Sequence, residues 1–174
     1  MMIQKMIDLL DHGVKRWSLR TNIRWLLWQL AMRIFVEKGR ERGITVTVED
    51  YGGTNNPCSY AKYLKRFLDE IPDLRFALDS GNLYYAGRGD DILELMRHAK
   101  GRIAHVHLKD QTREDNHKYA TIGLGAVPNA EIVRTVAADG YDGWYTLENP
   151  VGDIYEDVLR QVAVLKAWVA DGRR

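Results

Sequence analysis

The stretch I-A-H-V-H-L-K-D, residues 103–110, decides the fold that we expect for this chain. Its side chains alternate with a period of two, which is typical of a β-strand. Both faces are mostly apolar, so we expect a strand that is buried on both sides, as in a parallel sheet. His105 and His107 share one face, and His107 stands near the carboxyl end of the strand. In parallel α/β sheets and barrels, ligands bind at that end.

The same strand pattern occurs three more times, and each strand is followed by apolar residues at helical spacing. We expect strands at residues 44–49, 75–79, 103–108 and 144–148. We expect helices after them at about 59–70, 90–100, 128–139 and 154–169, and before them at 3–13 and 23–42. A strand followed by a helix, repeated four times, predicts an α/β fold of parallel βα units.

The predicted helix at 23–42 carries two apolar stripes at helical spacing. The first stripe consists of Ile23, Leu26, Leu27, Leu30 and Ile34. The second consists of Trp25, Trp28, Met32 and Phe35. We expect the aromatic stripe to serve packing rather than to bind a cofactor.

Length and composition predict one domain over residues 1–174, with the βα pattern covering about 23–170. The chain has 174 residues with 45% hydrophobic content, which is enough for one well-formed core. Its 25 Lys+Arg and 24 Asp+Glu give a net charge of +1. Such a balance gives no reason to expect nucleic acid or an anionic membrane as a partner.

Several sequence features favour a cytoplasmic protein. Cys58 is the single cysteine, so no internal disulfide can form, which fits a reducing compartment. We expect Cys58 to be chemically inert rather than reactive. The most apolar run, 23–36, contains Arg24 and Arg33 and is shorter than the ~20 residues that span a bilayer. No cleavage motif follows the N-terminal apolar positions, so we expect no signal peptide.

Four side chains of metal-ligand type stand where the predicted strands end. They are Glu49, Asp79, His107 and Glu148. In each strand, period-two geometry places the ligand on the face opposite the almost wholly apolar one. Helices would cover the apolar faces, so the four ligands would point toward a barrel interior from one edge of the sheet. We therefore expect them to converge on one centre.

Three carboxylates and one imidazole suit a divalent cation. They would repel one another strongly in a poorly solvated site, and a cation offsets that cost. The donor set favours one ion of Mn²⁺, Mg²⁺, Co²⁺ or Zn²⁺. An isolated carboxylate at a strand end is more often a cap or an ion-pair partner, and it is the shared face of all four that favours metal binding.

Four short motifs, in this order, resemble the xylose isomerase-like TIM-barrel superfamily. They are V-E-D-Y at 48–51, A-L-D-S-G-N at 77–82, A-H-V-H-L-K-D at 104–110 and L-E-N-P at 147–150. The resemblance implies a parallel (β/α) TIM-barrel type of fold and a sugar or sugar-phosphate isomerase/epimerase. It also implies that Glu49, Asp79, His107 and Glu148 hold one divalent metal ion.

The chain departs from that family in three ways. Epimerase-type members often carry a histidine three residues after the metal-binding aspartate, where this chain has Asn82. The loop 114–123 lacks the additional ligands of the endonuclease branch, so DNA repair is not expected. A complete barrel needs at least ~200 residues. The four predicted strands match the C-terminal half, and we expect a half or partial barrel with four strands.

The resemblance also implies roles for individual residues. The expected chemistry is proton transfer next to a carbonyl through an enediolate, with Glu49 and Glu148 as the two catalytic acid–base groups. Lys109, Asn82 and His117 are candidate substrate-binding residues, with a solvated loop lysine and an exposed bystander histidine as the alternatives for Lys109 and His117. We expect His105 to be a hydrogen-bonded core histidine.

Three functions remain open at this point. The first is a metal-dependent isomerase/epimerase acting on a small sugar or polyol-derived substrate. The second is a dehydratase or lyase that acts on a keto-polyol with the same metal site. The third is a truncated, non-catalytic remnant or assembly partner. Because four open strands expose two edges, we expect a homo-oligomer or pairing with a complementary half-barrel.

Overall fold

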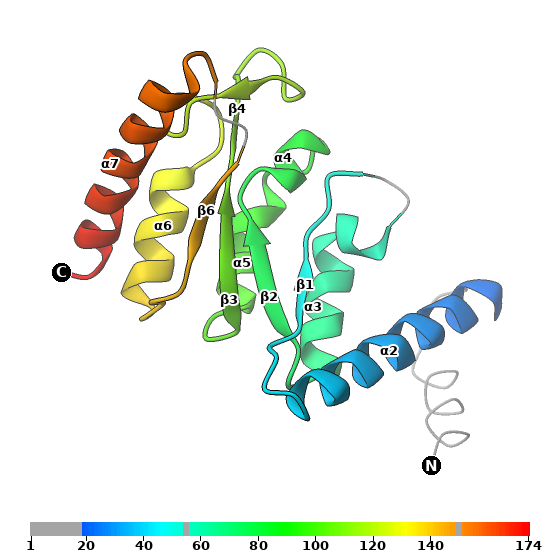
Figure 1. Ribbon diagram of the computed structural model, residues 1–174. Helices are drawn as coiled ribbons and strands as arrows, with labels where there is room; N and C mark the ends of the chain where they lie inside the picture. The colour runs from blue at the N-terminus through cyan, green and yellow to red at the C-terminus, as the bar shows by residue number, and fades with distance from the viewer. Residues whose placement is uncertain (1–18, 54–55, 149–150) are drawn as a thin grey trace.

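The computed structural model describes residues 19–53, 56–148 and 151–174, and its centre is a parallel four-stranded sheet (Figure 1). The strands are β1 (Thr47–Glu49), β2 (Arg75–Asp79), β3 (Ile103–Leu108) and β6 (Tyr145–Leu147). They lie in the order β1-β2-β3-β6, and all three pairings are parallel. The predicted α/β fold with four parallel strands is therefore confirmed. In the part of the chain that is described, β1 and β6 each pair on one side only, so the barrel is not closed.

Helices cover one face of this sheet (Figure 1). They are α3 (Ala61–Glu70), α5 (Asp91–His98), α6 (Asn129–Ala138) and α7 (Ile154–Gly172). The core lies between them and the apolar face of the strands, where Phe76, Leu78, Val106 and Leu108 are fully buried. Helix α3 packs against α5, and α6 packs against α7. The opposite face of the sheet carries the polar strand residues, as the alternation predicts.

Strands β2 and β3 coincide with the predicted ranges, whereas β1 and β6 are shorter. Residues 44–46 precede β1; the Val46 carbonyl oxygen accepts a hydrogen bond from the Arg75 N–H at the start of β2, whereas Ile44 is exposed. Four short elements were not predicted: the 3-10 helix η1 (Pro57–Ser59), α4 (Asn82–Tyr85), β4 (Asp110–Gln111) and β5 (Tyr119–Ala120). The last two form an antiparallel hairpin within the loop that was expected to be irregular. The helix predicted at 3–13 lies outside the described residues.

Helix α2 (Leu19–Arg40) crosses the end of the sheet at which the strands begin (Figure 1). Its buried stripe contains Trp25, Gln29 and Val36, and the Trp25 ring stacks on Phe67 at 4.4 Å. The packing role of Trp25 is as predicted. Ile23, Leu27, Leu30, Ile34 and Phe35 form a second stripe, here called the outer face of α2, and all five are exposed. Two other members of the predicted aromatic packing stripe, Trp28 and Phe35, are exposed in the described structure, so the packing prediction fails for them.

The loop after β3 is held by one buried carboxylate. Asp110 is 1% exposed and accepts hydrogen bonds from four backbone N–H groups, of Gln111, Gly123, Gly125 and Val127. A Cβ at Gly125 would lie 2.2 Å from the Gln111 carbonyl oxygen, so only glycine fits there. This network fixes the segment that follows His107 and Lys109. Within the described residues, no helix has the length and apolar character needed to cross a membrane.

Candidate metal centre

The four parallel strands point the same way (Figure 1), and the four predicted metal ligands lie in or directly after their last residues. Glu49 and Asp79 are the last residues of β1 and β2, and Glu148 directly follows β6. In the parallel ladder Asp79 is the register partner of His107, and His107 is the partner of Thr146. The strand alternation that predicted a shared face therefore places these side chains next to one another.

Three of the four side chains form a compact set of metal-ligand atoms. One atom each from Glu49, Asp79 and His107 lies within 4.8 Å of the other two. His107 Nδ1 is 3.0 Å from Glu49 Oε1 and 3.9 Å from Asp79 Oδ2. Glu148 is not in this mutual set, although its Oε1 lies 2.9 Å from His107 Nδ1. The structure thus contains a triad suited to a metal, with Glu148 beside it.

The triad is electrostatically costly when its carboxylates are charged. Burial is the main reason that the pKa of Glu49 is raised, and the charges of Asp79 and Glu148 add to it, while His107 opposes it. Burial also raises the pKa of Asp79, although Lys109 and two backbone N–H groups oppose this. A divalent cation stabilises such charged forms. The chemistry of the donor atoms fits a metal ion, and so does the electrostatic cost of keeping these carboxylates charged.

Asp79 is held so that one of its oxygens faces the centre. Its Oδ1 accepts hydrogen bonds of 2.9 Å from the backbone N–H groups of Gly81 and Asn82, at the start of α4. Its Oδ2 is buried and points toward His107 and Lys109. A Cβ at Gly81 would lie 2.2 Å from Lys109 Cγ, so glycine makes room for the lysine side chain.

Lys109 is a buried member of the site rather than a solvated loop residue. Its Nζ is 2.8 Å from Asp79 Oδ2, 2.8 Å from Glu148 Oε2 and 3.3 Å from Asn82 Oδ1. Burial by itself would lower the pKa of this ammonium, but the two carboxylates outweigh burial and raise the pKa above its ordinary value. Lys109 is therefore a fixed positive charge at the edge of the triad.

Of the other two candidate substrate-binding residues, Asn82 lies at the site and His117 does not. Asn82 lies at the site, where its side-chain Nδ2 donates to the Asp50 carbonyl oxygen at 2.7 Å and its Oδ1 meets Lys109. His117 lies on the loop between β4 and β5, where its side chain is 60% exposed and contacts the edge of the Tyr85 ring. His117 makes its described polar contacts with Asp115 rather than with the triad.

His105 lies one layer below the triad and makes the hydrogen bond that was predicted for it. Its Nε2 is 2.7 Å from Thr146 Oγ1, and its ring packs edge-on against His107. The residue is half-buried rather than part of the core. Burial, followed by the charge of His107, lowers the pKa of His105 and so favours the neutral imidazole.

Asp50 is a site residue that the sequence analysis missed. It is 1% exposed, and its Oδ1 accepts a 2.8 Å hydrogen bond from the Asp79 backbone N–H. Burial and the neighbouring charge of Asp79 raise the pKa of Asp50 well above its usual range. Its position directly after the ligand Glu49 was the only available signal, because an aspartate that follows a strand is otherwise a common turn residue.

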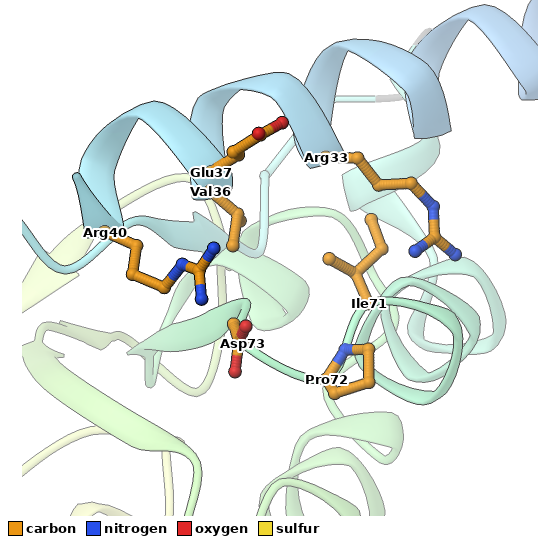
Figure 2. Close-up of a pocket in the computed structure, with 7 residues that line it drawn as sticks. All are labelled: Arg33, Val36, Glu37, Arg40, Ile71, Pro72 and Asp73. Atoms are coloured by element: carbon orange, nitrogen blue, oxygen red, sulfur yellow. The ribbon is translucent and has the colours of Figure 1, made fainter.

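A cavity of about 280 Å³ lies away from this centre (Figure 2). It is lined by Arg33, Val36, Glu37, Arg40, Ile71, Pro72 and Asp73. These residues come from α2 and from the segment before β2, which is the end of the sheet where strands begin. Active sites of TIM barrels lie at the other end. The triad, rather than this cavity, is therefore the candidate functional site.

Comparison with known proteins agrees with this geometry. A family model described as xylose isomerase-like TIM barrel matches residues 10–168. Two curated relatives are inosose dehydratases. The protein from Geobacillus thermodenitrificans (strain NG80-2) is 25% identical over 126 residues, which is 62% of this chain and 41% of the relative. The protein from Histophilus somni (strain 129Pt) is 30% identical over 99 residues, which is 55% of this chain and 32% of the relative.

Solved structures show the same fold. A xylose isomerase-like TIM barrel protein from Mycobacterium smegmatis, in complex with magnesium, superposes with a TM-score of 0.66 at 17% identity, over 86% of this chain and 52% of that one. A D-tagatose 3-epimerase-like protein gives a TM-score of 0.63 at 20% identity, over 82% of this chain and 53% of the other. The chain spans less than half the length of the curated relatives and about half of these barrels.

Proposed function

This chain belongs to the xylose isomerase-like TIM-barrel family, and from that premise we propose that it acts in proton transfer next to the carbonyl group of a sugar or polyol. The preferred activity is a divalent-metal-dependent isomerase or epimerase. The observation that carries this proposal is the triad of Glu49, Asp79 and His107, whose ligand atoms lie within 4.8 Å of one another. Similarity to both epimerases and dehydratases supports the general type of chemistry.

We propose that Glu49, Asp79 and His107 hold one ion of Mn²⁺, Mg²⁺, Co²⁺ or Zn²⁺, with Glu148 as the fourth ligand. Glu148 approaches His107 closely enough for a modest side-chain movement to bring it into the set. A bound divalent ion would supply a Lewis acid that polarises the substrate carbonyl and stabilises the negative charge left when a carbon-bound proton is removed.

Glu49 and Glu148 are the two groups proposed to move the proton. They approach His107 Nδ1 at 3.0 and 2.9 Å, so both carboxylates border the same centre. Burial raises the pKa of Glu49 above its ordinary value, which suits a general base. Lys109 orients Glu148 through its second oxygen, so that Glu148 is held as a carboxylate facing the centre. One glutamate would remove the proton and the other would return it.

A dehydratase is the second candidate, and the specific observation in its favour is that both curated relatives are inosose dehydratases. The first step would be the same removal of a proton next to the carbonyl. A hydroxyl group on the neighbouring carbon would then leave with a proton from an acid of the site, so that the products are water and an unsaturated ketone. The glutamate that had accepted the proton from carbon, Glu49 or Glu148, would return it to the leaving hydroxyl group, since both border the centre.

We propose that the active form contains a second four-stranded half, from another copy of this chain or from a complementary half-barrel. Proton transfer to carbon needs a pocket that excludes water and orients the sugar. Glu49 is 43% exposed and His107 is 22% exposed, so the described sheet alone leaves this centre open. The isolated half should therefore bind metal but turn over substrate slowly.

Exchange of substrate hydrogen with solvent deuterium tests the proposal. The protein is incubated in D₂O with a panel of ketoses, ketose phosphates and keto-polyols, with and without added Mn²⁺. Metal-dependent deuterium at the carbon next to the carbonyl supports an isomerase or epimerase. Loss of water from a substrate would instead identify a dehydratase. No exchange with any substrate, from a sample that holds metal, would contradict catalysis and favour a non-catalytic remnant.

A further inference from the structure

Lys109 and His107 both contact the carboxylates of Asp79 and Glu148. Asp79 Oδ2 is the oxygen that faces His107, at 3.9 Å, and it is also 2.8 Å from Lys109 Nζ. Glu148 has one oxygen on His107 Nδ1, at 2.9 Å, and the other on Lys109 Nζ, at 2.8 Å. The ammonium and the imidazole thus share the Oδ2 oxygen of Asp79 and contact different oxygens of Glu148.

The groups around Lys109 hold its ammonium group at this site. The side chain is 11% exposed, and Asp79 is completely buried. An ammonium group has three N–H donors, and the oxygens of Asp79, Glu148 and Asn82 surround it. The stem runs past Gly81, where a Cβ would collide with Lys109 Cγ. The backbone of Lys109 is also fixed, because its N–H and carbonyl oxygen both bond to Ser80 Oγ at 3.1 Å.

From this geometry we propose that Lys109 is a built-in counter-cation, which holds Asp79 and Glu148 in place in the metal-free protein and lowers the affinity of the centre for a divalent ion. The inference rests on the proposed metal site. With Lys109 present, the three carboxylates of Glu49, Asp79 and Glu148 need two further positive charges for neutrality, which is the charge of one divalent ion. Without Lys109 the same centre attracts that ion more strongly, because a neighbouring positive charge has been removed.

The test compares Mn²⁺ binding by wild type and Lys109→Met, measured by calorimetry with MnCl₂ alone. Methionine keeps most of the length of the side chain but removes its charge. We expect Lys109→Met to bind Mn²⁺ roughly tenfold more tightly, on the scale of the repulsion between a single and a double charge near the protein surface. Lys100→Met is the matched control, because Lys100 pairs with Asp139 outside the site. Its affinity should stay within about twofold of wild type.

A second readout uses stability rather than affinity. The metal-free Lys109→Met protein should melt at a lower temperature than wild type, because two carboxylates lose their counter-ion. Added Mn²⁺ should raise the melting temperature of Lys109→Met by more than it raises that of wild type. If Lys109→Met is unfolded without metal, Lys109→Gln replaces it, and recovery of folding by Mn²⁺ then supports the inference. Failure of Mn²⁺ to refold either variant would overturn it.

The outcomes separate this inference from the proposed function. If wild type binds Mn²⁺ and Lys109→Met binds it equally or more weakly, the counter-cation role is wrong while the metal site stands. If only Lys109→Met binds Mn²⁺, the lysine outcompetes the ion in wild type, which supports the inference. If neither protein binds Mn²⁺, Co²⁺ or Mg²⁺, the metal site itself is wrong and the inference is overturned with it.

Discussion

The Oδ1 oxygen of Asp50 accepts a hydrogen bond of 2.8 Å from the backbone N–H of Asp79. Asp50 is the residue after the proposed ligand Glu49, and Asp79 is a second proposed ligand, so this bond joins the ends of β1 and β2 at the candidate metal centre. Both residues are 1% exposed or less, which makes a broken bond costly. The relative position of two proposed ligands therefore depends on a residue that is not a ligand.

The first prediction concerns this bond. Burial raises the pKa of Asp50, so a comparison of two uncharged replacements avoids the effect of its charge. Asp50→Asn keeps a side-chain oxygen for the Asp79 N–H, and Asp50→Ala leaves that N–H buried without an acceptor. We expect the free energy of unfolding of Asp50→Ala, measured by urea denaturation, to be about 1–3 kcal/mol lower than that of Asp50→Asn. Equal stabilities would show that the bond contributes nothing.

The second prediction concerns Glu148. Because Glu148 lies beside the triad rather than within it, Glu148→Gln should weaken Mn²⁺ binding by less than about tenfold. The amide still offers an oxygen, but it cannot carry a proton, so deuterium exchange into an active substrate should fall by about 100-fold or more. Glu114→Gln, on the exposed loop after β4, is the control and should leave both quantities unchanged. A Glu148→Gln protein with normal exchange would remove Glu148 from the mechanism.

The alternation of apolar and polar side chains was sufficient to predict the sheet and to place the four candidate ligands at the same end of its strands. Strands β2 and β3 match the predicted ranges because both are central strands with a partner on each side. Strand β3 is, however, half-buried over most of its length rather than buried on both faces as predicted. The start of β1 was predicted too early, because Ile44 and Thr45 have strand propensity but no strand partner in the described residues. Propensity does not show where a neighbouring strand begins.

The contacts that depend on the tertiary structure could not be predicted. Lys109 follows a strand in a polar stretch, so its sequence fits a solvated loop equally well. Its burial comes from Asp79 and Glu148, which are brought together only by the sheet order. The exposure of two aromatic residues of α2, Trp28 at 39% and Phe35 at 62%, could not be predicted either. Which stripe of a helix is buried depends on what covers it, and hydropathy does not contain that information.

The third prediction concerns association. The outer face of α2 exposes apolar side chains, and within the described residues β1 and β6 each have one strand edge without a partner, so the chain should self-associate or bind a complementary half. Leu27→Lys puts a charge at the centre of that face and should reduce the mass measured by light scattering. Leu124→Lys, on an exposed loop, is the control. A wild-type chain that stays monomeric and binds no hydrophobic dye would contradict this prediction.

The fourth prediction concerns Cys58, which is buried next to the start of α3. Burial is the main cause that raises the pKa of its thiol to about 12, and the charge of Asp50 adds to it. The folded protein therefore keeps the thiol protonated at pH 8, and a disulfide reagent should react with it far more slowly than with the urea-unfolded chain. Because the folded pKa is above the unfolded value of ~8.5, this group should also cost stability progressively above that pH. Equal reaction rates in the folded and unfolded protein would contradict the burial.

Binding of a single divalent ion by the triad is the most direct test of the central claim. Titration of the metal-free protein with MnCl₂ in a calorimeter should give about one ion per site for wild type. Asp79→Ala and His107→Ala should each abolish that binding, because each removes one of three converging ligand atoms. His98→Ala, which removes an imidazole paired with Asp69 elsewhere on the surface, should bind as wild type does. Stoichiometric binding that survives both Asp79→Ala and His107→Ala would contradict the account.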